Sequence, residues 1–249
     1  MQRYFLNENP TQQFQLPADV AHHFVTVLRA NIDDQAEFVL PDQKTVVLAK
    51  LVAFKDEGAL MEIITEKTVD VELPVTVTLV LGLAKGDKPE LVVQRGTELG
   101  ASQFIFVETD WSVVHWGNKV DRKLARLRKI AQGAAEQSHR LVIPTVTYVA
   151  HLQDINLADD TVKVVAWEES AKQGETAQFV QAVKQAVGVG QMAIMFGPEG
   201  GLKETELASL TARGFVPVGL GPRILRAETA PLYALSALSY ATELERNGG

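Results

Sequence analysis

The chain has 249 residues, of which 46% are hydrophobic and 22% charged, and its formal net charge is −7. A chain of this size and composition forms one large domain or a small domain plus a medium one, and no apolar run reaches the roughly 18 residues of a membrane span. The absence of cysteine excludes disulfides, thiolate metal sites, iron–sulfur clusters and a cysteine nucleophile.

The first part of the chain is predicted to be a small, mostly β domain. A helix is expected over 17–30, and alternating apolar and polar residues predict strands at 36–40, 45–54 and 59–65. The pattern changes over 68–74, and we place the boundary so that the two domains are 1–72 and 73–249. Residues 1–70 carry six cations against eleven acids, so any contact with nucleic acid there would be local.

Beyond Pro74 strands and helices alternate, which predicts an α/β domain. Strands are expected at 75–83, 103–107, 141–149, 162–167, 191–196 and 215–219. Helices are expected at 87–99, 119–139, 175–187, 203–213 and 229–244, whereas 150–161 is predicted to be a loop.

The helix over 119–139 begins with a basic segment. Six cations face one acid, Asp121, and the cations are Lys119, Arg122, Lys123, Arg126, Arg128 and Lys129. Two interpretations stay open for the outer face of this helix. It is either an ordinary solvated surface or a strip that contacts phosphates.

Two glycine-bearing loops, 197–201 and 220–229, each follow an apolar strand and precede a helix. Such turns are where open α/β sheets bind ligands. The acids Glu199, Glu204 and Glu206 in or after the first loop would repel a phosphate, and the chain contains neither a Walker pattern nor a G-x-G-x-x-G after a strand. We therefore predict a cofactor without phosphates that is held by backbone groups.

Four segments carry a resemblance to a known family. The segments are 94–100 (QRGTELG), 136–140 (EQSHR), 197–202 (GPEGGL) and 220–230 (LGPRILRAETA). In this order and spacing they resemble the bacterial 16S ribosomal RNA uridine-N3 methyltransferases, a family of the SPOUT, or trefoil-knot, superfamily. The resemblance covers the whole chain and includes His23 and 27–29 near the N-terminus.

The resemblance implies a knotted SPOUT methyltransferase domain, preceded by a small PUA-like β-barrel that binds RNA. It implies transfer of a methyl group from S-adenosyl-L-methionine to N3 of a uridine in 16S ribosomal RNA, as free RNA or in the small subunit. It also implies a homodimer that acts in ribosome biogenesis. The N-terminus has no signal-peptide pattern, so a cytoplasmic protein is expected, and the five histidines lack ligand spacing, so no metal site is predicted.

The resemblance also assigns residues to roles. The cofactor-binding residues would be Phe196, Gly197, Pro198, Glu199, Gly200, Gly201, Leu220, Gly221, Ile224, Leu225, Arg226 and Thr229. The RNA-binding residues would be Arg3, His23 and Arg29, joined by Lys119, Arg122 and Arg126 if the basic helix contacts phosphates. The catalytic candidates are Arg226, Arg140 and Glu228.

The chemistry gives these candidates their roles. The imino proton of uridine N3 must leave, and a fixed cation would stabilise the resulting anion on O2 and O4. Arg226 is the first candidate for that cation and Arg140 the second. Structural ion pairs are the alternative, with Arg223 or Arg226 paired to Glu228 and Arg140 paired to Glu136. Glu228, Glu136 or a water molecule could accept the proton.

The chain departs from the family pattern at two positions, with Ala227 in place of a common threonine and Lys203 in place of a serine that often caps the helix. Two other functions stay open. One is a SPOUT enzyme that methylates a ribose 2′-hydroxyl, and the other is a non-catalytic protein that binds RNA.

Overall fold

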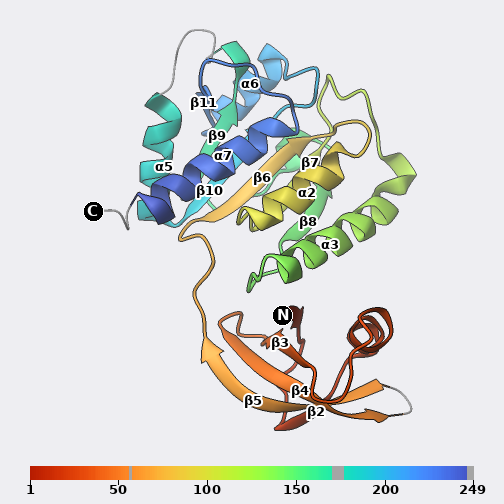
Figure 1. Cartoon of the computed structure of the whole chain (residues 1–249). Helices are drawn as coiled ribbons and strands as arrows, with labels where there is room; N and C mark the ends of the chain where they lie inside the picture. Colours follow the sequence, from red (N-terminus) through yellow and green to blue (C-terminus); the bar gives the residue numbers. More distant parts are fainter. Residues whose placement is uncertain (56–57, 170–176, 246–249) are drawn as a thin grey trace. The chain divides into compact units, whose positions relative to one another are not determined.

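The computed structural model describes residues 1–55, 58–169 and 177–245 (Figure 1). The chain divides into two compact units. The first contains residues 1–72 and, in addition, the short segment 136–142, and the second contains 73–135 and 143 onward. The expected domains were continuous in sequence, so the assignment of 136–142 to the first unit is a difference from the prediction.

The first unit is built on a five-stranded sheet. Its order is β1 (Gln2–Phe5), β3 (Gln35–Val39), β4 (Thr45–Lys55), β5 (Gly58–Thr68) and β2 (Gln13–Gln15), and only the β1–β3 pair is parallel. The three longer strands agree with the predicted ones, whereas β1 and β2 were not predicted. Tyr4, Phe24 and Phe38 pack together in the core of this unit.

The predicted helix at 17–30 is shorter in the structure. It consists of α1 (Ala18–Ala21) and one turn of π-helix, η1 (His22–Val27). Arg29 adopts a left-handed conformation with φ of 58°, which an α-helix cannot accommodate. The chain therefore leaves the helix before residue 30.

The second unit contains a six-stranded parallel sheet. Its order is β11 (Val216–Val218), β9 (Val162–Ala166), β10 (Gln191–Phe196), β6 (Thr76–Gly82), β7 (Gln103–Val107) and β8 (Thr145–Val149). The alternation of strands and helices beyond Pro74 is thus confirmed. Two 3-10 turns lie in the connections, η2 (Gly117–Lys119) before α3 and η3 (Leu152–Asp154) within the predicted loop at 150–161.

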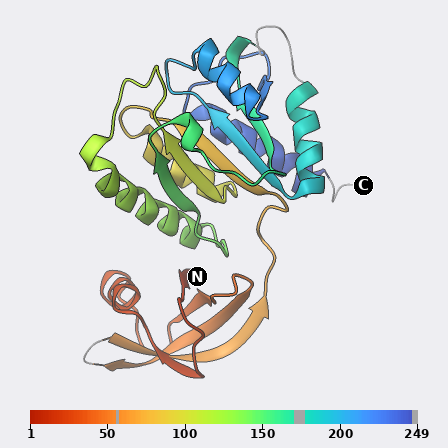
Figure 2. The ribbon, with the colours of Figure 1, turned by 180° about the vertical axis from the view of Figure 1, so that it is seen from behind.

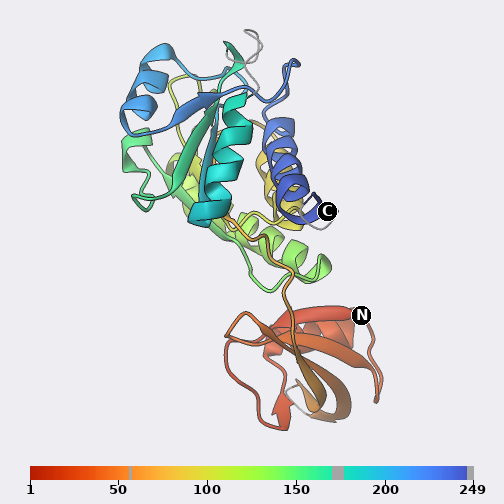
Figure 3. The ribbon, with the colours of Figure 1, turned by 90° about the vertical axis from the view of Figure 1, so that its left-hand side faces the viewer.

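Helices cover both faces of this sheet. One face packs against α2 (Lys88–Glu98), α3 (Val120–Gln137), α5 (Ala177–Val189) and α7 (Thr229–Ser239), which η4 (Tyr240–Leu244) extends. The other face packs against α6 (Glu204–Ala212) and the loop around Ile155. Figure 3 shows α2 and α7 on one side of the sheet and α6 on the other, and Figure 2 shows α6 from behind. The successive strand residues Leu79 and Val80 belong to opposite cores, as the two-residue period of a strand requires.

Most predicted bounds in this unit agree with the structure to within two residues, but β8 begins at Thr145 instead of residue 141. The reason is that the backbone N–H groups of Leu141 and Val142 donate to the carboxylate of Glu72 in the first unit. The first two residues of the helix expected at 175–187 lie outside the described residues. No helix in the described part of the chain could cross a lipid bilayer.

Candidate functional site

A cavity of about 710 Å³ lies at the carboxyl ends of β9, β10 and β11. Both glycine-bearing loops line it, the first through Phe196 and residues 197–201 and the second through Leu220, Ile224, Leu225 and Arg226. The structure therefore brings the two motifs together, as predicted. Gly221, Glu228 and Thr229 do not line the cavity, although they belong to the second motif.

The first loop is packed too closely to carry side chains at several positions. A Cβ atom on Gly197 would lie 3.0 Å from the carbonyl carbon of Gly201, and one on Gly200 would lie 3.1 Å from Cβ of Trp111. At the end of β6, a Cβ atom on Gly82 would lie 2.5 Å from Cδ of Pro198. The loop backbone itself therefore forms the wall of the cavity, which suits a ligand held by N–H and C=O groups.

Acidic side chains give this wall a negative character. Glu199 and Glu204 line the cavity, and both would repel a phosphate. Glu206 is buried and has a structural role, since its carboxylate accepts hydrogen bonds from the backbone N–H groups of Lys203 (2.9 Å) and Asp110 (2.9 Å). Lys203 is the N-cap of α6 and Glu206 is its third residue, so the bond between them is one of the two hydrogen bonds of a capping box. The helix keeps this bond although a lysine occupies the N-cap position.

Lys88, the first residue of α2, lies between two acids from the two loops. Its ammonium group is 2.8 Å from Oε1 of Glu199 and 3.4 Å from Oε2 of Glu228. Burial alone would raise the pKa of the Glu199 carboxyl, but the hydrogen bond from Lys88, backbone hydrogen bonds and the charge of Lys88 together outweigh burial and lower that pKa. Glu228 thus pairs with Lys88 and not with Arg223 or Arg226, the partners that the sequence suggested.

Arg226 lines the cavity, and its side chain is exposed. The guanidinium makes no ion pair or hydrogen bond within the described residues. The neighbouring Ile224 is 68% exposed, so this end of the cavity combines a free cation with an uncovered apolar side chain. An apolar side chain can pack against a planar, uncharged ligand, and a nearby guanidinium can stabilise a negative charge that develops on it.

Sequence reasoning missed several residues at the cavity, among them Lys88, Trp111 and Trp167. Trp167 follows β9 directly, and the rule that ligands bind beyond the carboxyl ends of strands could have identified it. A signal for Lys88 was also present, because a cation at the first position of a helix opposes the helix dipole. Trp111 had no such signal, since it lies in the loop after β7 and packs against Gly200 and Gly201 of a loop that is distant in sequence.

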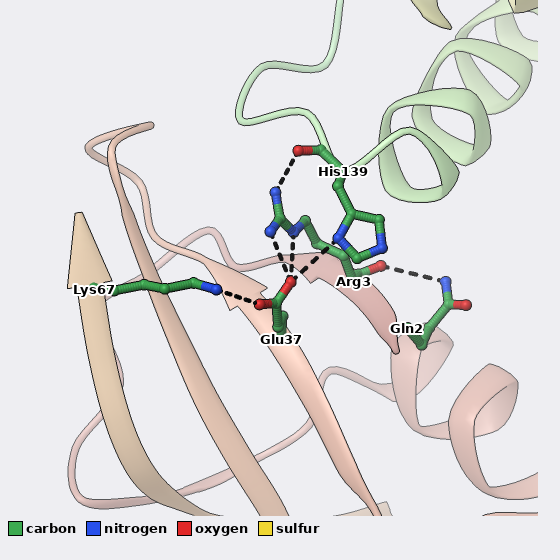
Figure 4. Close-up of polar contacts among 5 residues, drawn as sticks. All are labelled: Gln2, Arg3, Glu37, Lys67 and His139. Atoms are coloured by element: carbon green, nitrogen blue, oxygen red, sulfur yellow. Dashed lines mark hydrogen bonds and ion pairs between the residues drawn. The ribbon is translucent and has the colours of Figure 1, made fainter. Parts of the chain in front are cut away.

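The burial and contacts of Arg3 speak against its predicted role in RNA binding. Arg3 is only 3% exposed, and its guanidinium donates to Oε2 of Glu37 (2.6 and 3.1 Å) and to the carbonyl oxygen of His139 (Figure 4). Lys67 lies 2.9 Å from the other oxygen of Glu37, and Nδ1 of His139 lies 3.3 Å from Oε2. Arg3 thus satisfies buried groups within the first unit and is not available to a phosphate.

Arg140 also differs from its prediction as a catalytic cation. It is 4% exposed, and its guanidinium forms an ion pair with Glu72 in the first unit. It does not line the cavity. The sequence suggested Glu136, four residues earlier, as a structural partner. Glu72 lies 68 positions away in the sequence, so this partner had no local signal.

The other RNA-binding candidates of the first unit have different surroundings. Nδ1 of His23 lies 2.9 Å from the hydroxyl of Tyr4, so this half-buried histidine has a structural partner. Arg29 is exposed. Of His23 and Arg29, Arg29 is therefore the residue that is more accessible to RNA.

The basic face of α3 is partly neutralised. Arg126 forms an ion pair with Glu90 at 2.7 Å, and Arg128 donates to the carbonyl oxygen of Val146. Lys123 lies over the ring of Trp116, 5.5 Å from its centroid. Lys119 and Arg122 are exposed, with no ion pair elsewhere in the described ranges. No group of three or more potential metal ligands occurs in the described part of the chain.

Comparison with known proteins gives one consistent result. Residues 71–239 match the family model of the RNA methyltransferase domain. The chain is 43% identical to ribosomal RNA small subunit methyltransferase E of Bacillus subtilis over 99% of both chains. The structure of ribosomal RNA small subunit methyltransferase E from Neisseria gonorrhoeae, bound to S-adenosyl methionine, has a TM-score of 0.83 at 29% identity and covers 97% of this chain and 98% of its own.

A structure from Legionella pneumophila in complex with the same cofactor has a TM-score of 0.81 at 27% identity, with coverage of 96% of this chain and 97% of its own. The family model spans more than half of the chain, and the Bacillus relative matches it almost from end to end. The chain therefore belongs to the ribosomal RNA small subunit methyltransferase E family, within the RNA methyltransferases.

Proposed function

We propose that the protein uses S-adenosyl-L-methionine to methylate N3 of a uridine in 16S, small-subunit ribosomal RNA. The family supports RNA methylation, and the relative from Neisseria carries this cofactor. The observation that supports the choice of a ring nitrogen is the position of Arg226, an exposed guanidinium on the wall of the cavity that has no ion pair among the described residues. A base that loses a proton needs such a group, because its negative charge spreads over two oxygens.

The cavity fits the cofactor. Its walls are the backbones of the two loops, and added Cβ atoms at Gly197 and Gly200 would press against neighbouring atoms. The acids Glu199 and Glu204 favour a cationic ligand over a phosphate. When bound, the cofactor supplies an electrophilic methyl group on a positively charged sulfur. Phe196, Leu220 and Leu225 offer apolar contacts beside the polar backbone.

The residues of the chain then act on the uridine. The loops hold the acceptor nitrogen in line with the methyl group and exclude water from the line of transfer. The guanidinium of Arg226 stabilises the anion that forms on O2 and O4 as the imino proton leaves. Glu228 faces Lys88 and not the cavity. We therefore assign the proton to a water molecule, with Glu228 outside the reacting groups.

Further features follow from the resemblance alone. In this proposal the first unit is a PUA-like barrel that helps to hold RNA, and the loops at 197–201 and 220–229 meet through a trefoil knot. The protein is a cytoplasmic homodimer. Arg29, Lys119 and Arg122 are its first candidates for phosphate contacts, because their side chains are exposed, and Arg126 joins them when RNA displaces Glu90.

Substitution of Arg226 tests the proposal. Arg226→Ala should lower kcat by about a hundredfold or more, as the loss of one oxyanion-stabilising donor does, while the Kd for S-adenosylmethionine stays within about tenfold. Arg223→Ala, which removes the other exposed arginine that lines the cavity, is the matched comparison and should lower kcat far less. The assay uses small-subunit RNA that lacks the modification, followed by nucleoside analysis. Formation of 2′-O-methyl nucleosides, or binding without any product, would refute the proposal.

A further inference from the structure

The two loops of the cavity are joined by a single charged side chain. Glu199 lies in the loop after β10, and Glu228 lies at the start of α7, 29 positions later in the sequence. Lys88, at the start of α2, contacts both acids, at 2.8 and 3.4 Å. Three segments that are far apart in sequence thus meet at one ammonium group beside the cavity.

The position of Lys88 is unfavourable for the helix alone. The N-terminus of a helix carries a partial positive charge, so a lysine as its first residue loses free energy that an acid there would gain. The hydrogen bond that Lys88 donates to Glu199 raises the pKa of the lysine and outweighs burial, which lowers it, so the ammonium group stays charged. The ion pairs with Glu199 and Glu228 therefore offset the free-energy cost of a cation at this helix end. The folding of α2 alone does not require a lysine there.

The two contacts of Lys88 are not equal. The contact with Glu199 has the length of a charge-assisted hydrogen bond. The contact with Glu228 is longer, and its Oε2 atom is buried without a hydrogen-bond partner in the described part of the chain. A buried carboxylate oxygen that lacks a donor is costly, and a small shift of the 220–229 segment towards Lys88 would remove that cost.

We propose that Lys88 is a positioning residue that couples the two cofactor loops. It holds the 197–201 loop in place before ligand binding, and its contact with Glu228 closes to a full hydrogen bond when the cofactor fills the cavity. The ligand lies between the loop of Glu199 and the segment that ends at Glu228, so any contraction of the cavity around it moves these acids towards the same cation. Part of the affinity for the cofactor therefore comes from the contact between Lys88, which lines the cavity, and Glu228, which does not.

This inference rests on the proposed function, and the experiment separates the two. The Kd for S-adenosylmethionine is measured by calorimetry on the full chain, together with the free energy of unfolding in urea without ligand. Lys88→Met should raise this Kd by about tenfold, which corresponds to a coupling of about 1.4 kcal/mol. Lys88→Arg should restore it to within about threefold, since the charge is kept. Lys184→Met, which removes an exposed lysine of α5, is the control and should leave it unchanged.

A double-mutant cycle then tests the closing contact. Glu228→Gln should raise the Kd, and the double variant Lys88→Met, Glu228→Gln should bind no more weakly than Lys88→Met alone. The coupling between the two residues could appear in the free energy of unfolding and not in the Kd. In that case Lys88 forms only a structural ion pair, and the inference fails. If the unaltered protein itself binds no S-adenosylmethionine, the proposed function fails.

Discussion

At the carboxyl ends of β9, β10 and β11, Arg226 is exposed and has no ion pair among the described residues, whereas Arg3 in the N-terminal sheet is 3% exposed and bound to Glu37. The resemblance assigned a binding role to both arginines. At the cavity, the exposed guanidinium of Arg226 lies beside walls that are made of backbone atoms, whereas the guanidinium of Arg3 is buried in ion pairs and hydrogen bonds of its own unit. This difference is the reason that we propose a functional role for Arg226 and not for Arg3.

The largest effect is expected from the buried arginine. Arg3→Met leaves Glu37 as a poorly compensated buried charge and should reduce the free energy of unfolding by about 3–5 kcal/mol. Lys67→Met removes the exposed partner of the same carboxylate and should cost about 1 kcal/mol or less. Urea unfolding followed by circular dichroism measures both. A weaker affinity of Arg3→Met for RNA at unchanged stability would reverse the assignment of this residue.

The same cluster should make the protein sensitive to acid. Burial raises the pKa of Glu37, but the hydrogen bonds from Lys67 and Arg3 outweigh it and lower that pKa from 4.5 to about 2. Because the folded-state pKa is depressed, the stabilisation is complete above pH 4.5 and is lost as the pH falls towards 2, by a total on the order of 3 kcal/mol. Urea titrations at several pH values test this dependence. In Glu37→Gln the slope over this range should be reduced, and an equal slope would contradict the cluster as its source.

At the cavity the sensitive atoms belong to the backbone. Gly82→Ala places a Cβ atom 2.5 Å from Cδ and 2.6 Å from N of Pro198. The loop must move, so we expect a loss of about 1–3 kcal/mol in stability and a weaker affinity for S-adenosylmethionine. Gly133→Ala, in α3 with no neighbour within 4 Å of the added atom, should instead stabilise the protein slightly. Equal affinities in the two variants would show that the close approach at Gly82 is unimportant.

The smallest effect is expected at the basic helix. Neutralising Lys119, Arg122 and Arg126 to glutamine should reduce the slope of log Kd for RNA against log salt by about 0.7 for each single-strand phosphate that the helix no longer neutralises. Arg126 should contribute least, because Glu90 already pairs with it. Lys184→Gln on α5 is the control. An unchanged slope in the triple variant would make this face of α3 an ordinary solvated surface.

Local sequence pattern predicted the parallel sheet, its helices and the two loops, since strand and helix periodicities and glycine turns are properties of neighbouring residues. It could not predict that Glu72 binds Arg140 or that Glu37 binds Arg3, because these partners are separated by 68 and 34 positions. The short strands β1 and β2 were missed for a similar reason. Each has at most four residues, and its pairing partner, not its own pattern, makes it a strand.

The placement of the three tryptophans has a practical consequence. Trp111 and Trp167 line the cavity, whereas Trp116 is 2% exposed and stacks on Tyr148. A molecule that enters the cavity alters the surroundings of the first two indoles and leaves the third as an internal reference. The intrinsic ultraviolet emission of the protein can therefore report ligand uptake in real time, without a dye or a radioactive label.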